Sequence, residues 1–364
     1  MQTYYWKLVN NKDSGNIIKQ AAYFIRRGEV VAFPTETVYG LGANGLNPEA
    51  VAKIFAAKGR PGDNPLILHI ADMKEIEQLT TGLNANARAL ARRFWPGPLT
   101  LVVNKSALVP DIVSAGLDTV AVRFPDNEYA RQLIKASSCP IAAPSANISG
   151  RPSPTNAQDV LEDMQGKIAC VLDGGSCGIG LESTVVDTTE PVPVILRPGG
   201  ITYEMLTELL GAVDIDPALQ GEKGFKPKAP GMKYRHYAPK ASMYLLEGGA
   251  RVLLPRFVQQ ALAAGRRVGV LCSTPMRKKL LPHGSLVVSD WGTDKEKLAA
   301  ELFYLLRDFD RTCPDVIISE GVEEDGIGLA VMNRLRKAAG YQLVTLEKGA
   351  VKLKGSDVLP DFMQ

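Results

Sequence analysis

The sequence lacks the features that define disulfide scaffolds, structural metal sites and membrane proteins. Its 5 cysteines include no Cys-x-x-Cys pair and only 3 histidines accompany them, so we expect no protein-held metal site. Dispersed cysteines in odd number predict free thiols in a reducing compartment. No apolar run approaches the roughly 20 residues that span a bilayer, and the first residues do not resemble a signal peptide. These absences predict a cytoplasmic protein without a membrane partner.

The common nucleotide-binding and catalytic signatures are missing as well. The chain contains no Gly-x4-Gly-Lys-Ser/Thr, no Gly-x-Gly-x-x-Gly and no His-Glu-x-x-His. Residues 174–178 do have the Gly-x-Ser-x-Gly spacing of a nucleophile elbow. That elbow requires a helix directly after it, whereas residues 179–187 are typical of a loop and a strand. We therefore expect a glycine-rich turn there and not a serine hydrolase.

Length and pattern together indicate two domains. A chain of 364 residues corresponds to about two domains of ordinary size. Residues 1–211 mix strands and helices, and from residue 242 to 364 short strands alternate with helices, which is typical of a parallel sheet. Between them, residues 212–241 are rich in proline, lysine and aromatic residues. A long segment of this kind is functional or disordered, and we interpret it as an interdomain linker in which aromatic residues mixed with cations favour a function.

Polar residues concentrate between Phe33 and Ile70, where a core would otherwise continue. An apolar strand ends at Phe33, and Pro34 is followed at once by hydroxyl and carboxylate side chains. Glycines at 40, 42 and 45 follow, and glycine allows close approach to the backbone. We expect these glycines to let the backbone come close to a neighbouring group.

The next helix delivers two cations to the same region. Asn47 is suited to cap its start and Gly59 to close it. This geometry places Lys58 and Arg60 together at the helix exit. In the strand that follows, Leu66, Leu68 and Ile70 share one face and His69 lies on the other.

Further along the chain, helix starts are predicted from capping residues. Asp126 is expected to cap a helix that reaches Ile134. Thr155 and Gln158 have the spacing of a capping box for a helix that ends at Met164.

Several strands run into polar residues at their ends, which predicts a site for a polyanion. Charge-assisted bonds contribute about 1.5 to 3 kcal/mol each, so a few of them hold a nucleotide without a phosphate loop. No activated nucleophile is evident, so phosphoryl or nucleotidyl transfer would rest on positioning and electrostatics. The hydroxyls, amides and cations of this set are Thr35, Thr37, Thr119, Ser145, Ser149, Ser153, Ser183, Thr184, Asn64, Asn147, Lys58, Arg60, Arg123 and Arg197.

Taken singly, each of these residues also has an ordinary structural explanation. Lys58 could complement the C-terminal end of a helix, His69 could be a hydrogen-bonded core histidine, and Arg123 could pair with a surface carboxylate. Their occurrence together favours a binding site.

Several motifs stand out along the chain. They are Pro34-Thr-Glu-Thr-Val-Tyr-Gly-Leu-Gly, Lys58-x-Arg60-Pro, Pro65-Leu-Ile-Leu-His69-Ile, Ser145-Ala-Asn147-x-Ser-Gly, Glu182-Ser-Thr-Val-Val-Asp187, Arg197-Pro-Gly and Pro230-Gly-Met-Lys-Tyr234-Arg-His-Tyr237-Ala-Pro. Together they resemble the Sua5/YrdC family over residues 10–240. The resemblance implies an N-terminal YrdC-like twisted α/β sheet with a concave ligand groove. It also implies a C-terminal Rossmann-like parallel α/β domain of Sua5 type.

The resemblance implies an L-threonylcarbamoyladenylate synthase, a nucleotidyltransferase. Such an enzyme converts L-threonine, bicarbonate and ATP into threonylcarbamoyl-AMP and pyrophosphate, with Mg²⁺ held mainly by the ATP phosphates. The product serves the downstream machinery that forms N6-threonylcarbamoyladenosine at position 37 of tRNA.

The same resemblance assigns roles to individual residues. Lys58 and Arg60 would be catalytic, and the loop that ends at Tyr237 would close over the site. The residues expected to bind L-threonine are Thr37, His69, Arg123, Ala143 and Ser183. Those expected to bind ATP are Lys58, Arg60, Asn64, Thr119, Ser145, Asn147, Ser153, Arg197 and Tyr237.

Two other functions stay open at this point. One is a carbamoyl or nucleotidyl transferase that acts on another amine. The other is a noncatalytic module that contacts tRNA or double-stranded RNA through the basic linker, since a net charge of only +3 requires a local basic patch. Steep salt dependence without ATP turnover would identify an RNA binder.

Overall fold

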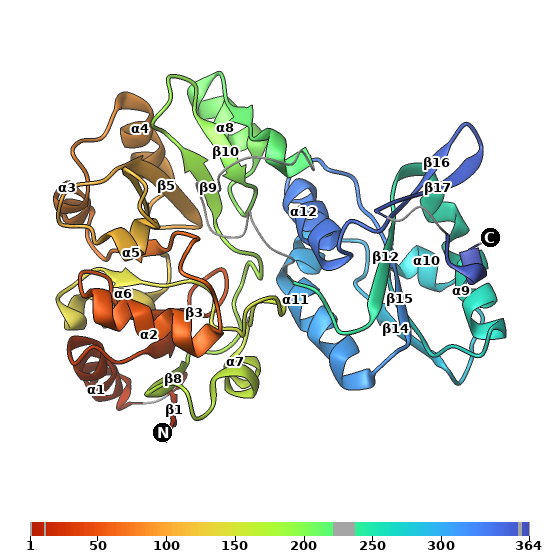
Figure 1. Ribbon diagram of the computed structural model, residues 1–364, viewed down its shortest axis with the longest axis horizontal. Coiled ribbons are helices and arrows are strands. Elements are labelled where there is room, and N and C mark those ends of the chain that lie inside the picture. The colour runs from red at the N-terminus through yellow and green to blue at the C-terminus, as the bar shows by residue number, and fades with distance from the viewer. Residues whose placement is uncertain (1, 11, 221–236, 356–358, 364) are drawn as a thin grey trace. The chain divides into compact units, whose positions relative to one another are not determined.

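The computed structural model describes residues 2–10, 12–220, 237–355 and 359–363. The chain divides into two compact units, the first containing residues 1–149 and 153–234 and the second residues 150–152 and 235–364 (Figure 1). Most of the segment interpreted as a linker, residues 221–236, lies outside the described residues. Its closure over a site therefore stays a prediction.

The described part of the first unit forms a mixed 11-stranded sheet in the order β1-β8-β2-β3-β7-β4-β6-β5-β9-β10-β11. Strand β4 is parallel to β6, whereas β5 is antiparallel to β6 and parallel to β9. The strands are β1 (Tyr4–Lys7), β2 (Val31–Phe33), β3 (Gly40–Asn44), β4 (Ile67–His69), β5 (Leu99–Asn104), β6 (Thr119–Arg123), β7 (Ile141–Ala142), β8 (Cys170–Asp173), β9 (Thr184–Asp187), β10 (Val194–Arg197) and β11 (Asp214–Ile215).

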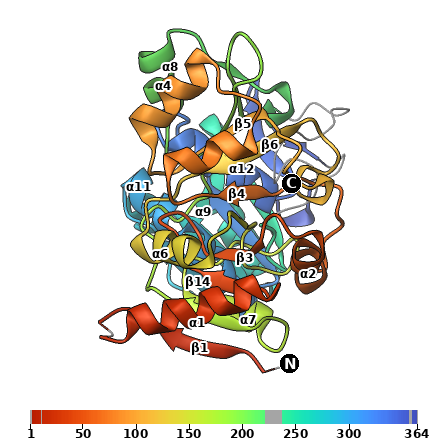
Figure 2. The ribbon, with the colours of Figure 1, turned by 90° about the vertical axis from the view of Figure 1, so that its left-hand side faces the viewer.

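Helices pack against this sheet, and α1 and α6 lie side by side (Figure 2). The helices are α1 (Ser14–Arg26), α2 (Pro48–Lys58), η1 (Met73–Glu75), α3 (Ile76–Leu79), α4 (Ala85–Phe94), α5 (Asp111–Ser114), α6 (Glu128–Ser137), α7 (Ala157–Met164), α8 (Tyr203–Leu210) and η2 (Pro217–Gln220).

Strand β2 shows how this sheet is buried on both faces. Val31 and Phe33 belong to one apolar cluster with Ile25 of α1 and Leu133 of α6. Ala32, whose side chain points the other way, belongs to the larger cluster of the unit. Continuous apolar sequence in β2 is therefore explained by burial on two sides.

The glycines of β3 make room for the protein's own side chains. A Cβ atom on Gly42 would lie 2.6 Å from Ile141 Cγ2 and 2.7 Å from Phe33 Cε1, and one on Gly45 would lie 2.5 Å from Leu68 Cδ2. The close approach expected of these glycines is confirmed, and the groups that the backbone approaches are side chains of the protein itself. The glycines let this segment lie against Phe33 and the neighbouring strands.

Two predicted helix caps are displaced by one residue. The cap of α6 is Asn127, whose side chain accepts from the Ala130 amide, and Asp126 instead pairs with Arg131. The cap of α7 is Asn156, which accepts from the amide of Asp159, and not Thr155. In both cases two capping residues stand next to each other, so sequence alone does not decide between them.

The second unit contains the parallel sheet that alternation predicted, with strand order β14-β13-β15-β12-β16-β17. Its strands are β12 (Ser242–Leu246), β13 (Val268–Cys272), β14 (Leu286–Asp290), β15 (Val316–Glu320), β16 (Leu343–Glu347) and β17 (Ala350–Lys354). Its helices are η3 (Gly248–Leu253), α9 (Leu254–Ala263), α10 (Thr274–Arg277), α11 (Lys295–Thr312), α12 (Gly328–Ala338) and η4 (Asp361–Met363).

Only β17 departs from the parallel arrangement among the described strands of this unit, because it pairs antiparallel with β16. These two strands form much of the described chain after Tyr341. The predicted α/β class is confirmed for both units. Among the described residues, no helix combines the length and the apolar character needed to cross a bilayer.

The packing of β3 predicts that Gly42→Ala will destabilise the first unit. Overpacking of this kind costs about 1 to 3 kcal/mol, and hydrogen exchange of peptides from β2 and β3 in the full chain should accelerate accordingly. Gly15→Ala is the matched control, since a Cβ at Gly15 meets nothing within 4 Å. Equal exchange in the two variants would contradict the packing argument.

Candidate active site

Polar residues distant in sequence meet at one edge of the first unit's sheet. His69 ends β4 and lies opposite Arg123 in the strand register, and Arg123 ends the parallel strand β6. Thr100, near the start of the antiparallel strand β5, lies opposite Arg123 in the register on the other side of β6. Ser183 lies directly before β9, and Arg197 ends β10. The sheet order therefore brings together five residues that lie between positions 69 and 197 of the chain.

Arg123 is the centre of this edge. It is only 4% exposed, which excludes the ordinary explanation that it pairs with a surface carboxylate. Its Nη1 donates to Thr37 Oγ1 at 2.8 Å, and its Nη2 lies 2.6 Å from Glu36 Oε1. Nε and Nη2 of Arg123 are buried and have no hydrogen-bond partner among the described residues, so the contact with Glu36 is an ion pair without hydrogen-bond geometry. Arg123 thus keeps donors for a further acceptor.

The hydroxyls around Arg123 are held in place by one another. Thr37 Oγ1 lies 2.9 Å from Thr35 Oγ1, which donates to the Val38 carbonyl at 2.6 Å. These bonds fix the turn after β2 and place Thr37 against Arg123. Fixed donors and acceptors are what recognition of a small polar ligand requires.

His69 is a neutral member of this group. Burial, and then the positive charge of Arg123, lowers the pKa of His69 to about 3. Its Nδ1 lies 3.2 Å from the Ile67 carbonyl, and its ring packs edge-on to Phe33. His69 therefore acts near neutral pH as a hydrogen-bonding group without charge.

A second run of bonds continues from Thr100 to Arg197. Thr100 Oγ1 lies 2.7 Å from Ser183 Oγ. Arg197 Nη2 donates to the same Ser183 Oγ at 3.0 Å, and Nε donates to the Ser183 carbonyl at 3.0 Å. Arg197 is 5% exposed, so a second buried cation lies at the same sheet edge.

Lys58 and Arg60 reach a neighbouring loop. Lys58 Nζ donates to the Ser145 carbonyl at 2.6 Å and to the Asn147 carbonyl at 2.7 Å. Arg60 Nη2 donates to the Asn64 carbonyl at 2.8 Å. Lys58 thus does more than complement a helix end, because it positions the loop after β7, whose Ser145 also bridges to Gly40 of β3.

The remaining predicted site residues lie in several different elements. Ala143 donates its amide to the Ile67 carbonyl at 2.9 Å, next to His69. Ser153 Oγ donates to Glu182 Oε1 at 2.6 Å. Thr119 shares a strand face with Arg123 but begins β6, about 13 Å away along an extended strand. Tyr237 belongs to the second unit, where it stacks on Phe303 at 4.9 Å.

The sequence did not identify three residues that the structure adds to the site. Thr100 and Glu182 contact the predicted Ser183 and Ser153, and these contacts depend on strand pairing that no local pattern reveals. Glu36 stands between the two threonines of the turn after β2. A carboxylate in an otherwise uncharged turn was the signal that could have marked it.

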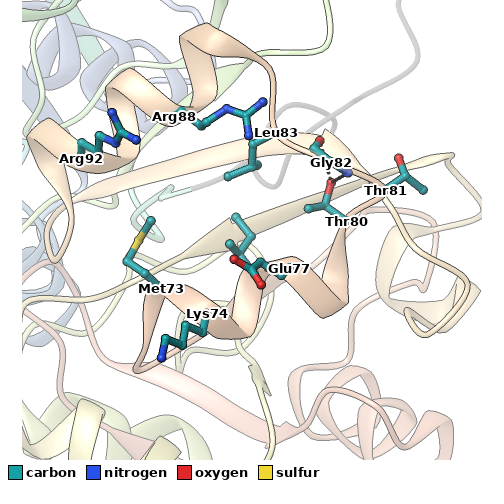
Figure 3. A pocket seen from close by; sticks show the side chains of 10 residues that line it. Met73, Lys74, Glu77, Thr80, Thr81, Gly82, Leu83, Arg88 and Arg92 are labelled. Atoms are coloured by element: carbon teal, nitrogen blue, oxygen red, sulfur yellow. Dashed lines mark hydrogen bonds between the residues drawn. The ribbon is translucent and has the colours of Figure 1, made fainter.

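A separate cavity of about 470 Å³ lies between η1, α3 and α4 (Figure 3). Lys74, Arg88 and Arg92 line it together with Glu77, and all four side chains are exposed. Exposed cations are hydrated and screened by salt, in contrast to the buried Arg123 and Arg197. None of the predicted site residues lines this cavity, so the cavity is separate from the candidate site.

Both units match families of known proteins. Residues 23–199 match the family of Sua5, YciO and YrdC proteins, described as telomere recombination, and residues 201–340 match the C-terminal domain of threonylcarbamoyl-AMP synthase. The chain is 53% identical over 331 residues to the threonylcarbamoyl-AMP synthase of Pyrococcus abyssi, covering 90% of this chain and 95% of that protein. It is 49% identical to the Bacillus subtilis threonylcarbamoyl-AMP synthase, over 90% and 94% of the two chains.

A solved structure gives the same result. The crystal structure of Pyrococcus abyssi Sua5 complexed with L-threonine matches with a TM-score of 0.89 at 49% identity, covering 95% of this chain and 100% of that chain.

The neutral state of His69 predicts a pH dependence of folding. The pKa of His69 is lowered on folding from 6.5 to about 3, so below pH 6.5 the unfolded chain binds a proton that the folded chain does not. The free energy of unfolding should therefore decrease as the pH is lowered. Between pH 7 and 5 the wild type should lose about 2 kcal/mol more than His69→Gln, as measured by urea unfolding. Parallel losses in the two proteins would show that His69 is not held neutral.

Proposed function

Because this chain belongs to the Sua5/YrdC family, in the long form with both domains, we propose that it synthesises L-threonylcarbamoyladenylate. The substrates are L-threonine, bicarbonate and ATP, and pyrophosphate is released. The observation that carries this proposal is the match over nine-tenths of the chain with threonylcarbamoyl-AMP synthases. The buried, polar sheet edge supports it, because it offers cations and hydroxyls to ATP and to the carboxylate of L-threonine.

The amino acid would lie against the edge formed by β4, β6 and the segment before β9. Arg123 retains donors for a carboxylate, and a charge-assisted pair of this kind is bidentate at its strongest. Thr37 and neutral His69 would direct the amino acid without adding charge. The residues assigned to L-threonine are Thr37, His69, Arg123, Ala143 and Ser183.

ATP would lie towards Lys58 and the loop after β7. The bonds of Lys58 to that loop hold Ser145 and Asn147 in place for a nucleotide, and Arg197 adds a buried positive charge. For Tyr237 the assignment rests on the family resemblance alone. The residues assigned to ATP are Lys58, Arg60, Asn64, Thr119, Ser145, Asn147, Ser153, Arg197 and Tyr237.

The reaction proposed is a nucleotidyl transfer. The threonine amine and bicarbonate form a carbamate with loss of water. A carbamate oxygen then bonds to the α-phosphorus of ATP, and the bond from that phosphorus to the oxygen bridging to the β-phosphate breaks to release pyrophosphate. Lys58 and Arg60 offset the negative charge that accumulates on the phosphates, which stabilises the transition state electrostatically.

Mg²⁺ would be bound to the ATP phosphates. The part of the chain that the structure describes contains no group of 3 or more His, Cys, Asp or Glu residues arranged to hold a metal ion. Mg²⁺ binds in nucleotide sites through one or two carboxylates and the substrate phosphates. The residues present therefore fit a metal carried by ATP better than one held by the protein.

The product would supply the machinery that modifies adenosine 37 of tRNA, in the cytoplasm. Direct contact with tRNA or double-stranded RNA remains the alternative function of the basic segment 212–241. A transferase that acts on another amine is separated from our proposal by omitting L-threonine or bicarbonate in turn, because each omission must stop pyrophosphate release.

We predict that Lys58→Ala and Arg60→Ala will greatly reduce threonine-dependent pyrophosphate release. Removal of one transition-state electrostatic contact costs about 100- to 1,000-fold in turnover. Lys53→Ala is the matched control, since Lys53 lies on the same helix but is exposed and pairs with Glu29. Turnover near that of the wild type in the Lys58 and Arg60 variants would refute the catalytic assignment.

Selection between L-threonine and L-serine should be modest. The two differ by one methyl group, which is worth about 10- to 200-fold in kcat/KM when binding alone discriminates. Steady-state pyrophosphate release with each amino acid measures this ratio. A much larger ratio would require a checking step beyond the pocket.

A further inference from the structure

Glu36 lies in the candidate site with no role assigned to it. Its side chain is 14% exposed, and its Oε1 lies 2.6 Å from Arg123 Nη2. Both carboxylate oxygens are buried and, within the described part of the chain, make no hydrogen bond. Its backbone is fixed, because the Glu36 carbonyl accepts from the Ile179 amide at 2.9 Å.

The Glu36–Arg123 ion pair leaves polar atoms of both residues without hydrogen bonds among the described residues. Buried charge pairs stabilise a fold only when they are well aligned and their remaining polar atoms are satisfied. Here four buried atoms, Nε and Nη2 of Arg123 and both oxygens of Glu36, lack hydrogen-bond partners among the described residues. Buried polar atoms in folded proteins are almost always bonded, so this cluster indicates a place for a ligand with both donors and acceptors.

The charges of the neighbouring groups indicate what that ligand is. Arg123 supplies one positive charge and Glu36 one negative charge. His69 is neutral near pH 7, and burial raises the pKa of the nearby Cys177 to about 12, so its thiol is neutral as well. Thr35 and Thr37 carry no charge. One cation beside one anion complements a zwitterion, in which an ammonium lies one carbon from a carboxylate.

We propose that Glu36 is a further residue of the amino-acid site, where its carboxylate binds the ammonium group of the amino acid whose carboxylate lies on Arg123. This inference rests on the proposed function. The two anchors are adjacent, as the two charged groups of an α-amino acid are. Glu36 holds the nitrogen that becomes the carbamate, and it selects α-amino acids over hydroxy acids of the same shape.

The test separates a direct contact from an indirect effect through Arg123. (R)-3-Hydroxybutyrate keeps the carboxylate, hydroxyl and methyl group of L-threonine and lacks only the amine. Isothermal titration of both ligands with wild type and Glu36→Gln forms a thermodynamic cycle. Loss of a charge-assisted contact should weaken L-threonine binding about 10- to 100-fold, whereas binding of 3-hydroxybutyrate should stay unchanged or tighten.

Two further variants complete the experiment. Glu29→Gln removes a partly exposed carboxylate that pairs with Lys53 and should leave the binding of both ligands unaffected. Glu36→Asp keeps the charge and should retain part of the preference for L-threonine, which also provides a measurement if Glu36→Gln does not fold.

The possible results lead to different conclusions. If Glu36→Gln weakens both ligands by the same factor, Glu36 only orients Arg123 and the inference is overturned. An unchanged affinity for L-threonine overturns it as well. If the wild type itself does not bind L-threonine, the proposed function fails and this inference falls with it.

Discussion

The burial of Arg123 at the end of a central strand is the constraint on which the candidate site depends. A guanidinium removed from water must be compensated by nearby acceptors or by a ligand. The protein provides Thr37 and the poorly aligned Glu36, and leaves other donors of Arg123 unsatisfied among the described residues. The same charge helps to keep His69 neutral. One buried cation thus sets the protonation of its neighbour and the chemistry of the ligand.

The packing beneath the site links stability to function. The glycines of β3 leave space for Phe33, and the Phe33 ring lies edge-on to His69 at 6.1 Å between ring centroids. A side chain added in β3 would displace Phe33 and so disturb His69. Small residues close to the site are therefore required for the protein's own packing.

Two groups of residues in the first unit suit the two ligands proposed for this enzyme. The network of Thr37, Arg123 and Glu36 suits a zwitterion, whereas Lys58 holds the loop that carries Ser145 and Asn147. The bridge between Gly40 and Ser145 connects the strand after the first group with the loop of the second. An amino acid and a nucleotide can therefore be held by elements that share one rigid sheet, which is what transfer between two substrates requires.

The sequence by itself determined the elements whose signals are local. Helix α2 is capped by Asn47 and closed by Gly59 at a φ of 60°, as its sequence predicts. The motifs also identified the family. Only the tertiary structure decided that His69 and Arg123 would pair, that Thr100 would reach Ser183 and that Glu36 would face Arg123. These contacts follow from the order of strands in the sheet, and hydrogen bonding between distant strands is not specified by any local pattern.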